Sequence, residues 1–172
     1  MIAENWMKLE QEAAGRVANP GVSALEQMRS RSGLEFLRDI TKGVLPFPPI
    51  GKTLNFFLVE VEEGRAVFQG TPTFDVYNPI GSVHGGWAAT LLDSCMACAI
   101  QTTLKKGFSY TTAELKVNLV RPMNDKTGPV RAEGNVIHPG RQVATSEGKL
   151  YGPDGKLYAH GTTTCVIFAL PD

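Results

Sequence analysis

The chain has 172 residues, and its 17 Lys and Arg residues are balanced by 17 Asp and Glu, so the formal net charge is zero. A protein that grips the nucleic-acid backbone usually carries a net basic charge, and this total shows none. Hydrophobic residues make up 42% of the chain, which does not fit an acidic, disordered composition. The length predicts one domain with an appendage.

No apolar run approaches the roughly 18 residues of a membrane span. The first twelve residues mix acids and bases and lack the apolar core of a signal peptide. The three cysteines, Cys95, Cys98 and Cys165, are too few and too odd in number for a disulfide framework. We therefore expect a reduced, cytoplasmic protein that does not associate with membranes.

Residues 1–50 are predicted to form an N-terminal arm and helical extension. The polar stretch 1–20 is interpreted as a mobile, partly helical arm, and segments 23–31 and 32–42 are predicted to be helical, with Gly43 ending the second. Residues 45–50 contain three prolines, which interrupt both helices and central strands. We expect this segment to be an extended connector.

Strand-forming residues dominate 54–61 and 65–69, which are joined by a turn at 62–64. Residues 83–104 are apolar nearly all round, as in a buried helix, with Ser82 as its predicted cap and Gly107 near its end. Four further strands are predicted at 112–120, 130–137, 142–151 and 157–168, and the alternation in the first places Thr112 on its polar face.

The predicted order is therefore two strands, one long helix and four strands. A helix that is apolar on all sides needs cover on all sides. An antiparallel sheet that wraps around it supplies part of that cover, and a second subunit can supply the rest. The predicted class is α+β, with one central helix and the helical extension beside it.

Two features of the central helix point to chemistry. Gly85 and Gly86 stand at its start, where backbone N–H groups have no partner in the helix and suit a carbonyl oxygen that becomes negative. Asp93 lies inside the apolar helix, and a carboxylate in such a place is a candidate nucleophile or general base. Asp93 follows Gly85 by eight positions, which correspond to about 12 Å along the helix axis. A helix start from one chain paired with Asp93 of a neighbour makes a better site, which predicts a symmetric dimer interface.

The spacing of these residues resembles a known family. The motif consists of Asn78, then His84-Gly85-Gly86, then Asp93. Its spacing resembles, without a gap, the motif of hotdog-fold acyl-CoA thioesterases of the phenylacetate-degradation (PaaI) type. The resemblance covers about residues 53–168 and includes the order of the elements. It implies a hotdog thioesterase domain at 51–172.

The resemblance also implies an activity and roles for residues. The activity is hydrolysis of an acyl-CoA to a free acid and CoA, without a metal or cofactor, in a homodimer or a dimer-of-dimers homotetramer. By position, the Gly85 N–H polarises the thioester carbonyl, Asn78 orients the carbonyl or the water, and Asp93 from the other subunit acts as general base or nucleophile. Thr112 is the expected hydroxyl residue after the helix, with Thr111 as the other choice. The substrate-binding candidates are Gly86, Thr111, Trp87 and Tyr77.

Several structural alternatives remain. His84 is a candidate base, but it can instead form hydrogen bonds near the helix start, and Asn78 before Pro79 is also a turn residue. Cys95 and Cys98 have the spacing of a redox or zinc pair, although core packing is the favoured interpretation. Scattered basic residues are candidates to meet CoA phosphates; they are Lys105, Lys106, Arg121 and Arg141.

Two other functions are consistent with the sequence. One is a hotdog hydratase or dehydratase acting on an acyl thioester, which would use His84 paired with an acid. The other is a non-catalytic acyl-CoA-binding or sensing domain, with residues 1–50 contacting a partner. Neither nucleic acid nor a membrane is an expected partner.

Overall fold

The computed structural model describes residues 2–17 and 20–171. Helices α1 (Ile2–Arg16), α2 (Leu25–Arg29), α3 (Gly33–Thr41) and α4 (Pro49–Thr53) precede strands β1 (Phe56–Glu62) and β2 (Arg65–Gly70). A 3₁₀ turn, η1 (Phe74–Val76), leads to α5 (Gly85–Thr102), and β3 (Phe108–Leu119), β4 (Val130–His138), β5 (Val143–Tyr151) and β6 (Leu157–Ala169) follow. The predicted order of two strands, one long helix and four strands is confirmed. Among the described helices, none is long and apolar enough to cross a membrane.

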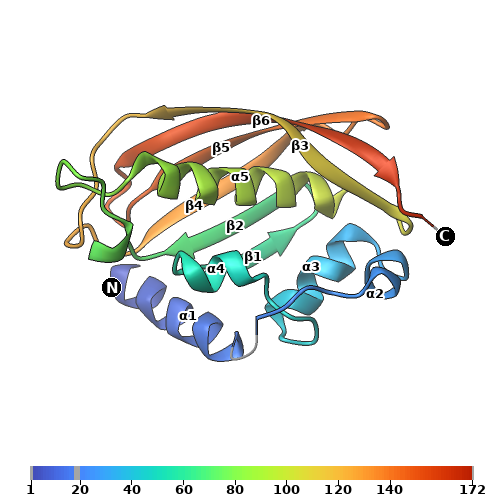
Figure 1. Ribbon diagram of the computed structural model, residues 1–172, viewed down its shortest axis with the longest axis horizontal. Helices are drawn as coiled ribbons and strands as arrows, with labels where there is room; N and C mark the ends of the chain where they lie inside the picture. Colours follow the sequence, from blue (N-terminus) through green and yellow to red (C-terminus); the bar gives the residue numbers. More distant parts are fainter. Residues whose placement is uncertain (1, 18–19, 172) are drawn as a thin grey trace.

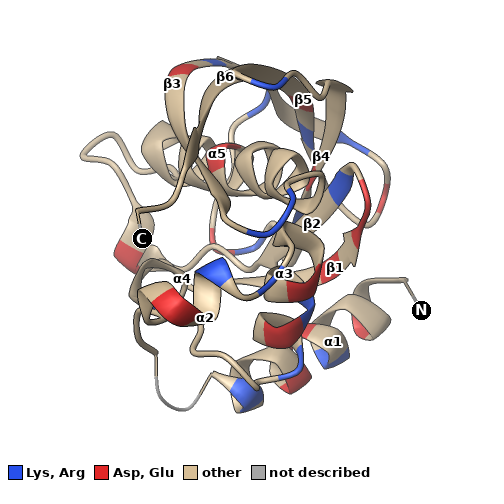
Figure 2. Cartoon of the chain, turned by 90° about the vertical axis from the view of Figure 1, so that its right-hand side faces the viewer, with Lys and Arg blue, Asp and Glu red and all other residues tan. Residues whose placement is uncertain are grey.

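The six strands form one antiparallel sheet in the order β1-β2-β4-β5-β6-β3. The sheet curls around α5, which contacts all six strands (Figure 1). Ten of the 18 residues of α5 are buried, so the predicted all-round apolar helix lies at the centre of the core. Figure 2 looks along this helix, with the sheet over one side of it and α3 and α4 on the other.

Three glycines form a row across the sheet beneath α5. Gly134 of β4 lies opposite Gly148 of β5, which lies opposite Gly161 of β6. A Cβ at Gly134 would stand 2.3 Å from the backbone oxygen of Cys95, and one at Gly148 would stand 2.7 Å from Met96 Cγ. The absence of a side chain at Gly134 lets the backbone of α5 approach the sheet closely at Cys95 and Met96, and the absence of one at Gly148 makes room for the Met96 side chain.

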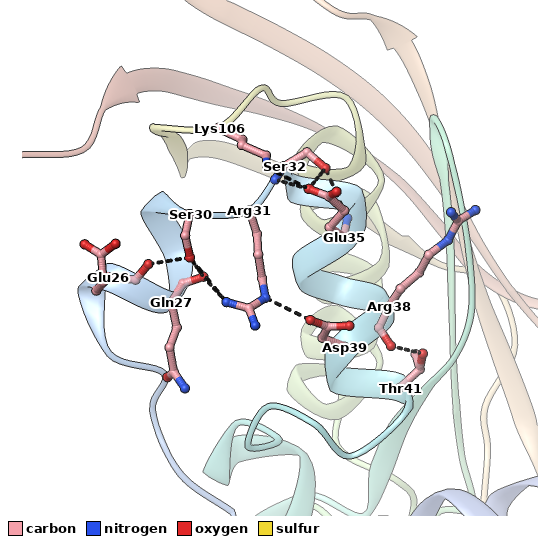
Figure 3. A network of polar contacts seen from close by, with 10 residues as sticks. All are labelled: Glu26, Gln27, Ser30, Arg31, Ser32, Glu35, Arg38, Asp39, Thr41 and Lys106. Carbon is pink, nitrogen blue, oxygen red and sulfur yellow. Dashed lines mark hydrogen bonds and ion pairs between the residues drawn. The ribbon is translucent and has the colours of Figure 1, made fainter.

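Helix α3 packs against the far end of α5. The Gly33 N–H donates to the Leu104 carbonyl at 2.9 Å, and a Cβ at Gly33 would collide with the Gln101 oxygen. Ser32 and Glu35 form the capping box that starts α3. Figure 3 shows the surrounding polar contacts, in which Glu35 also faces Lys106 at 3.9 Å and Arg31 binds Asp39 at 2.8 Å. These contacts fasten the extension to the turn that follows α5.

Helix α1 covers the outer face of the sheet at β1 and β2. Phe68 faces the core, so the next residue, Gln69, faces outward, and its Nε2 donates to the Trp6 carbonyl and to Glu10 Oε2 at 2.6 and 3.1 Å. Gln69 Oε1 accepts from Arg131 Nε at 3.0 Å, and the Arg131 guanidinium lies 4.4 Å from the centre of the Trp6 ring. The described part of the predicted mobile arm is therefore a docked helix.

The connector predicted at 45–50 is partly wrong, because Pro49 and Ile50 begin α4. Proline is tolerated there because the first helical residue needs no N–H donor within the helix. Phe47 and Leu37 belong to the same buried cluster as the core of the sheet. The domain boundary between residues 50 and 51 stays a prediction, and α4 spans it.

Candidate functional site

The start of α5 differs from the prediction by two residues. His84, not Ser82, is the N-cap, and its Nδ1 accepts a hydrogen bond from the Gly86 N–H at 2.8 Å. Because Nδ1 accepts, the neutral ring carries its proton on Nε2. The Gly85 N–H has no acceptor among the residues that the structure describes. It is an unpaired donor at the positive end of the helix dipole.

Asn78 organises the loop that leads into α5. Its Oδ1 accepts from the N–H groups of Ile80 and Ser82, both at 3.1 Å, and its Nδ2 donates to Ser82 Oγ at 3.0 Å. The backbone N–H of Asn78 also donates to the Ser82 carbonyl at 2.8 Å. The side chain is thus largely occupied by the turn. Its predicted role of orienting the carbonyl or water stays a prediction.

Asp93 is half-buried and forms one side-chain hydrogen bond. Thr112 Oγ1 donates to its Oδ1 at 3.0 Å, while Oδ2 has no donor among the described residues. The predicted polar face for Thr112 is wrong, because a β-bulge between Thr112 and Glu114 shifts the alternation of β3. The shift turns the Thr112 hydroxyl toward α5.

The surroundings of Asp93 are rich in uncharged sulfur. Burial raises the pKa of Cys98 to about 12, and the nearby charge of Asp93 acts in the same direction. Burial also raises the pKa of Cys165, whose sulfur lies 4.0 Å from Thr112 Oγ1. Both thiols therefore stay protonated at neutral pH and place no negative charge beside the Thr112 hydroxyl. Cys95 is fully buried in the core, as the packing interpretation predicted.

Four predicted residues meet at a pocket of about 300 Å³ beside the start of α5. Tyr77, His84, Gly86 and Trp87 line it, together with Leu54 and Thr90. The Trp87 side chain is only 3% exposed, and its Nε1 donates to the Leu54 carbonyl at 2.7 Å. The Tyr77 hydroxyl donates to Asp125 Oδ1 at 3.0 Å, which holds its ring in place.

Within one chain the predicted residues form two groups. One comprises Asp93 and Thr112; the other lies at the start of α5, eight residues earlier. Thr111 is exposed and, as the neighbour of Thr112 on β3, faces away from Asp93. The structure does not bring it to either group. Among the basic residues considered for CoA phosphates, Lys106 faces Glu35.

Sequence reasoning missed five neighbours of the site. Leu54 anchors Trp87 through a backbone carbonyl, Cys165 packs on Thr112, and the other three, Asp75, Val76 and Thr90, line the pocket. The Leu54 and Cys165 contacts join segments far apart in the chain and depend on how the elements pack. Thr90 could have been found from the sequence, because residues four apart on a helix lie on the same face and Thr90 follows Gly86 by four.

Comparison with known proteins identifies the class to which this fold and site belong. The family model for the thioesterase superfamily matches residues 80–159. The structure of a phenylacetic acid degradation-related protein from Ralstonia eutropha JMP134 is 30% identical, with a TM-score of 0.68, over 79% of this chain and 99% of that one. The chain belongs to the thioesterase superfamily, and the predicted hotdog fold of the PaaI type is confirmed.

Two curated relatives are similar over parts of the chain. A 1,4-dihydroxy-2-naphthoyl-CoA hydrolase of Listeria monocytogenes is 25% identical over 116 residues, which are 67% of this chain and 93% of that protein. A proposed esterase of Saccharolobus solfataricus is 33% identical over 88 residues, or 51% of this chain. The match spans only 57% of the length of the Saccharolobus protein. Membership in the superfamily supports hydrolysis of a thioester.

Proposed function

We propose that the protein is an acyl-CoA thioesterase, which hydrolyses an acyl-CoA thioester to a free acid and CoA. The observation that carries this proposal is the Asp93 carboxylate, which Thr112 holds at one oxygen and which has no donor at the other among the described residues. Such a carboxylate can accept a proton from water or attack a carbonyl carbon directly. The unpaired Gly85 N–H suits the oxyanion that forms.

In the general-base form, Asp93 takes a proton from water as the water oxygen bonds to the thioester carbon. The carbonyl oxygen becomes negative and accepts from the Gly85 N–H. Collapse of this intermediate breaks the carbon–sulfur bond, and the thiolate of CoA takes up the proton that Asp93 received from water. In the nucleophilic form, Asp93 itself bonds to the carbon and the carbon–sulfur bond breaks, which releases the CoA thiolate and leaves a mixed anhydride. Water then cleaves this anhydride to the free acid, restores the Asp93 carboxylate and supplies the proton that the thiolate takes up. No metal or cofactor is required by either route.

The site as proposed needs a second copy of the chain. Gly85 and Asp93 are about 12 Å apart along one helix, which exceeds the reach of a single carbonyl. Strand β3 is at the edge of the sheet, with Leu115 39% and Leu119 60% exposed. A Cβ at Gly85 would stand 2.5 Å from Leu119 Cδ1, so the end of β3 lies beside the start of α5.

Antiparallel pairing of two β3 strands joins the two groups. When Thr112 lies opposite Leu119 of the second copy, Asp93 beside Thr112 approaches Gly85 of that copy. An exposed edge strand with open N–H and carbonyl groups is suited to such pairing. We therefore propose a homodimer, or a dimer of dimers, as the active form.

The alternative hydratase or dehydratase function has less support. That chemistry needs His84 paired with an acid, and among the described residues no carboxylate binds His84. The non-catalytic alternative predicts tight acyl-CoA binding without turnover, which the assay below separates from hydrolysis.

The test is release of free CoA thiol from a panel of aromatic and short- to medium-chain acyl-CoAs. Asp93→Asn is expected to lower kcat/KM by at least about a hundredfold, as for loss of a general base. The matched control is Glu63→Gln, which removes an exposed carboxylate in the β1–β2 turn. A wild type inactive on the whole panel, or an Asp93→Asn variant with near-full activity, contradicts the proposal.

A further inference from the structure

We propose that the N-terminal extension closes the acyl pocket through Trp87, and that this closure selects compact acyl groups, short-chain or single-ring. This inference rests on the proposed function and concerns the substrate class of the same site. It assigns a role to residues 20–54, which comprise the described extension after α1 together with the rest of α4 and Leu54, and which lie outside the six-stranded sheet.

The closure begins with the position of the Trp87 indole. Trp87 lines the pocket beside Gly86 and also belongs to the buried core cluster that contains Phe56 and Leu91. At 3% exposure its ring separates the pocket from the core. An acyl group that enters beside the start of α5 therefore meets this ring as the inner wall.

The extension holds this wall in place. The Trp87 Nε1–H donates to the Leu54 carbonyl at 2.7 Å, and Leu54 is the residue that ends α4. The next residue, Asn55, has a φ of 53°, and its Nδ2 donates to the Thr71 carbonyl at 3.0 Å. The left-handed turn and this bond fix the direction in which α4 meets β1, and so they fix the Leu54 carbonyl.

The extension is itself firmly docked, so the wall has a rigid support. Gly51 of α4 leaves no room for a Cβ against the Phe47 ring and the Phe56 carbonyl. Phe47 packs on Phe57 of β1 with ring centres 5.9 Å apart. Loosening of α4 would thus disturb several buried contacts together, which opposes widening of the pocket by a long acyl chain.

The dimensions of the pocket agree with a compact ligand. Its volume of about 300 Å³ is at the lower end of the range of roughly 300–1,000 Å³ for small-molecule sites. Its apolar lining consists of the rings of Tyr77 and Trp87 and the side chains of Leu54 and Val76, and its polar members are Asp75, His84 and Thr90. A short alkyl chain or one aromatic ring fits this lining, whereas a longer chain meets the indole.

The experiment compares kcat/KM for octanoyl-CoA and butyryl-CoA in the wild type, Trp87→Leu and Trp87→Phe. The wild type is expected to prefer butyryl-CoA. Each methylene moved from water into an apolar site strengthens binding roughly fourfold. Trp87→Leu opens the pocket into the space of the indole, so the octanoyl-to-butyryl ratio is expected to rise about tenfold or more. Trp87→Phe keeps an aromatic wall but loses the bond to Leu54, and a smaller rise is expected.

The matched control is Phe68→Leu, which removes core volume from β2 at a residue that does not line the pocket. It is expected to lower the melting temperature without changing the ratio. If the wild type is active and its kcat/KM for octanoyl-CoA equals that for butyryl-CoA, the inference is overturned but the proposed function stands. If Trp87→Phe and folded Trp87→Leu both have the same octanoyl-to-butyryl ratio as Phe68→Leu, the inference is also overturned and the proposed function stands. A wild type inactive on every acyl-CoA overturns the proposed function and this inference with it.

Discussion

The hydrogen bond from Thr112 to Asp93 makes a sharp prediction for Thr112→Val. Valine keeps the shape of the side chain and removes only the hydroxyl that donates to Oδ1 at 3.0 Å. A hydrogen bond to a charged group contributes about 1.5–3 kcal/mol. Thr112 is only half-buried, so we take the lower end of that range. The expected fall in kcat/KM is then roughly tenfold, because 1.4 kcal/mol corresponds to a factor of ten.

The assay is steady-state release of CoA thiol, with the folding of each variant checked by thermal unfolding. Thr112→Ser keeps a hydroxyl and should retain activity within about threefold of the wild type, close to the measurement limit of such small energy differences. Thr162→Val removes an exposed hydroxyl from the neighbouring strand β6 and is the matched control. Full activity in Thr112→Val, or equal losses in the Ser and Val variants, would refute the assignment of the Thr112 hydroxyl.

Three further predictions concern stability. Gly134→Ala forces a Cβ to within 2.3 Å of the Cys95 carbonyl oxygen, so chemical denaturation should show a loss of about 1–3 kcal/mol or more in the free energy of unfolding; an unchanged midpoint contradicts close packing there. His84→Ala removes the acceptor for the Gly86 N–H and should lower the free energy of unfolding by about 1 kcal/mol, with His84→Asn restoring most of it. Burial of Glu10 raises its pKa above the ordinary 4.5, so at pH values between the unfolded and folded pKa the folded state binds more protons than the unfolded state. The contribution of Glu10 to the free energy of unfolding therefore falls as pH rises through the interval between these two pKa values. Denaturant unfolding from pH 4 to 7 should show that the free energy of unfolding of the wild type falls relative to that of Glu10→Gln as pH rises.

Much of the fold was predictable because its signals are local. The apolar residues of α5 and the alternation in β4 and β5 reveal burial directly, and the spacing from Asn78 through Gly85 to Asp93 indicated the family. The cap of α5 was placed at Ser82 because serine is a common N-cap, whereas His84 caps the helix in the structure. The choice between them depends on where the turn held by Asn78 ends.

The remaining parts depend on contacts between distant segments. The bulge at Thr112 reverses the face of a strand, and no residue type in β3 announces it. Helix α1 was missed as a docked element because its anchor, Gln69, is a polar residue that becomes buried only when α1 covers it. The link between Trp87 and Leu54 uses a backbone carbonyl, which every residue possesses.

The glycine row beneath α5 also shapes how this chain can diverge over evolutionary time. A side chain at Gly148 would meet Met96 Cγ and Sδ most closely, and a smaller residue at position 96 removes these atoms. The third contact, Leu92 Cδ2 at 3.2 Å, is also the end of a flexible side chain and can shift slightly. A side chain at Gly134 would meet the backbone of Cys95 and Met96, which no substitution on α5 removes. In descendants of this sequence, a larger residue at position 148 should therefore appear together with a smaller residue at position 96, whereas position 134 should stay glycine.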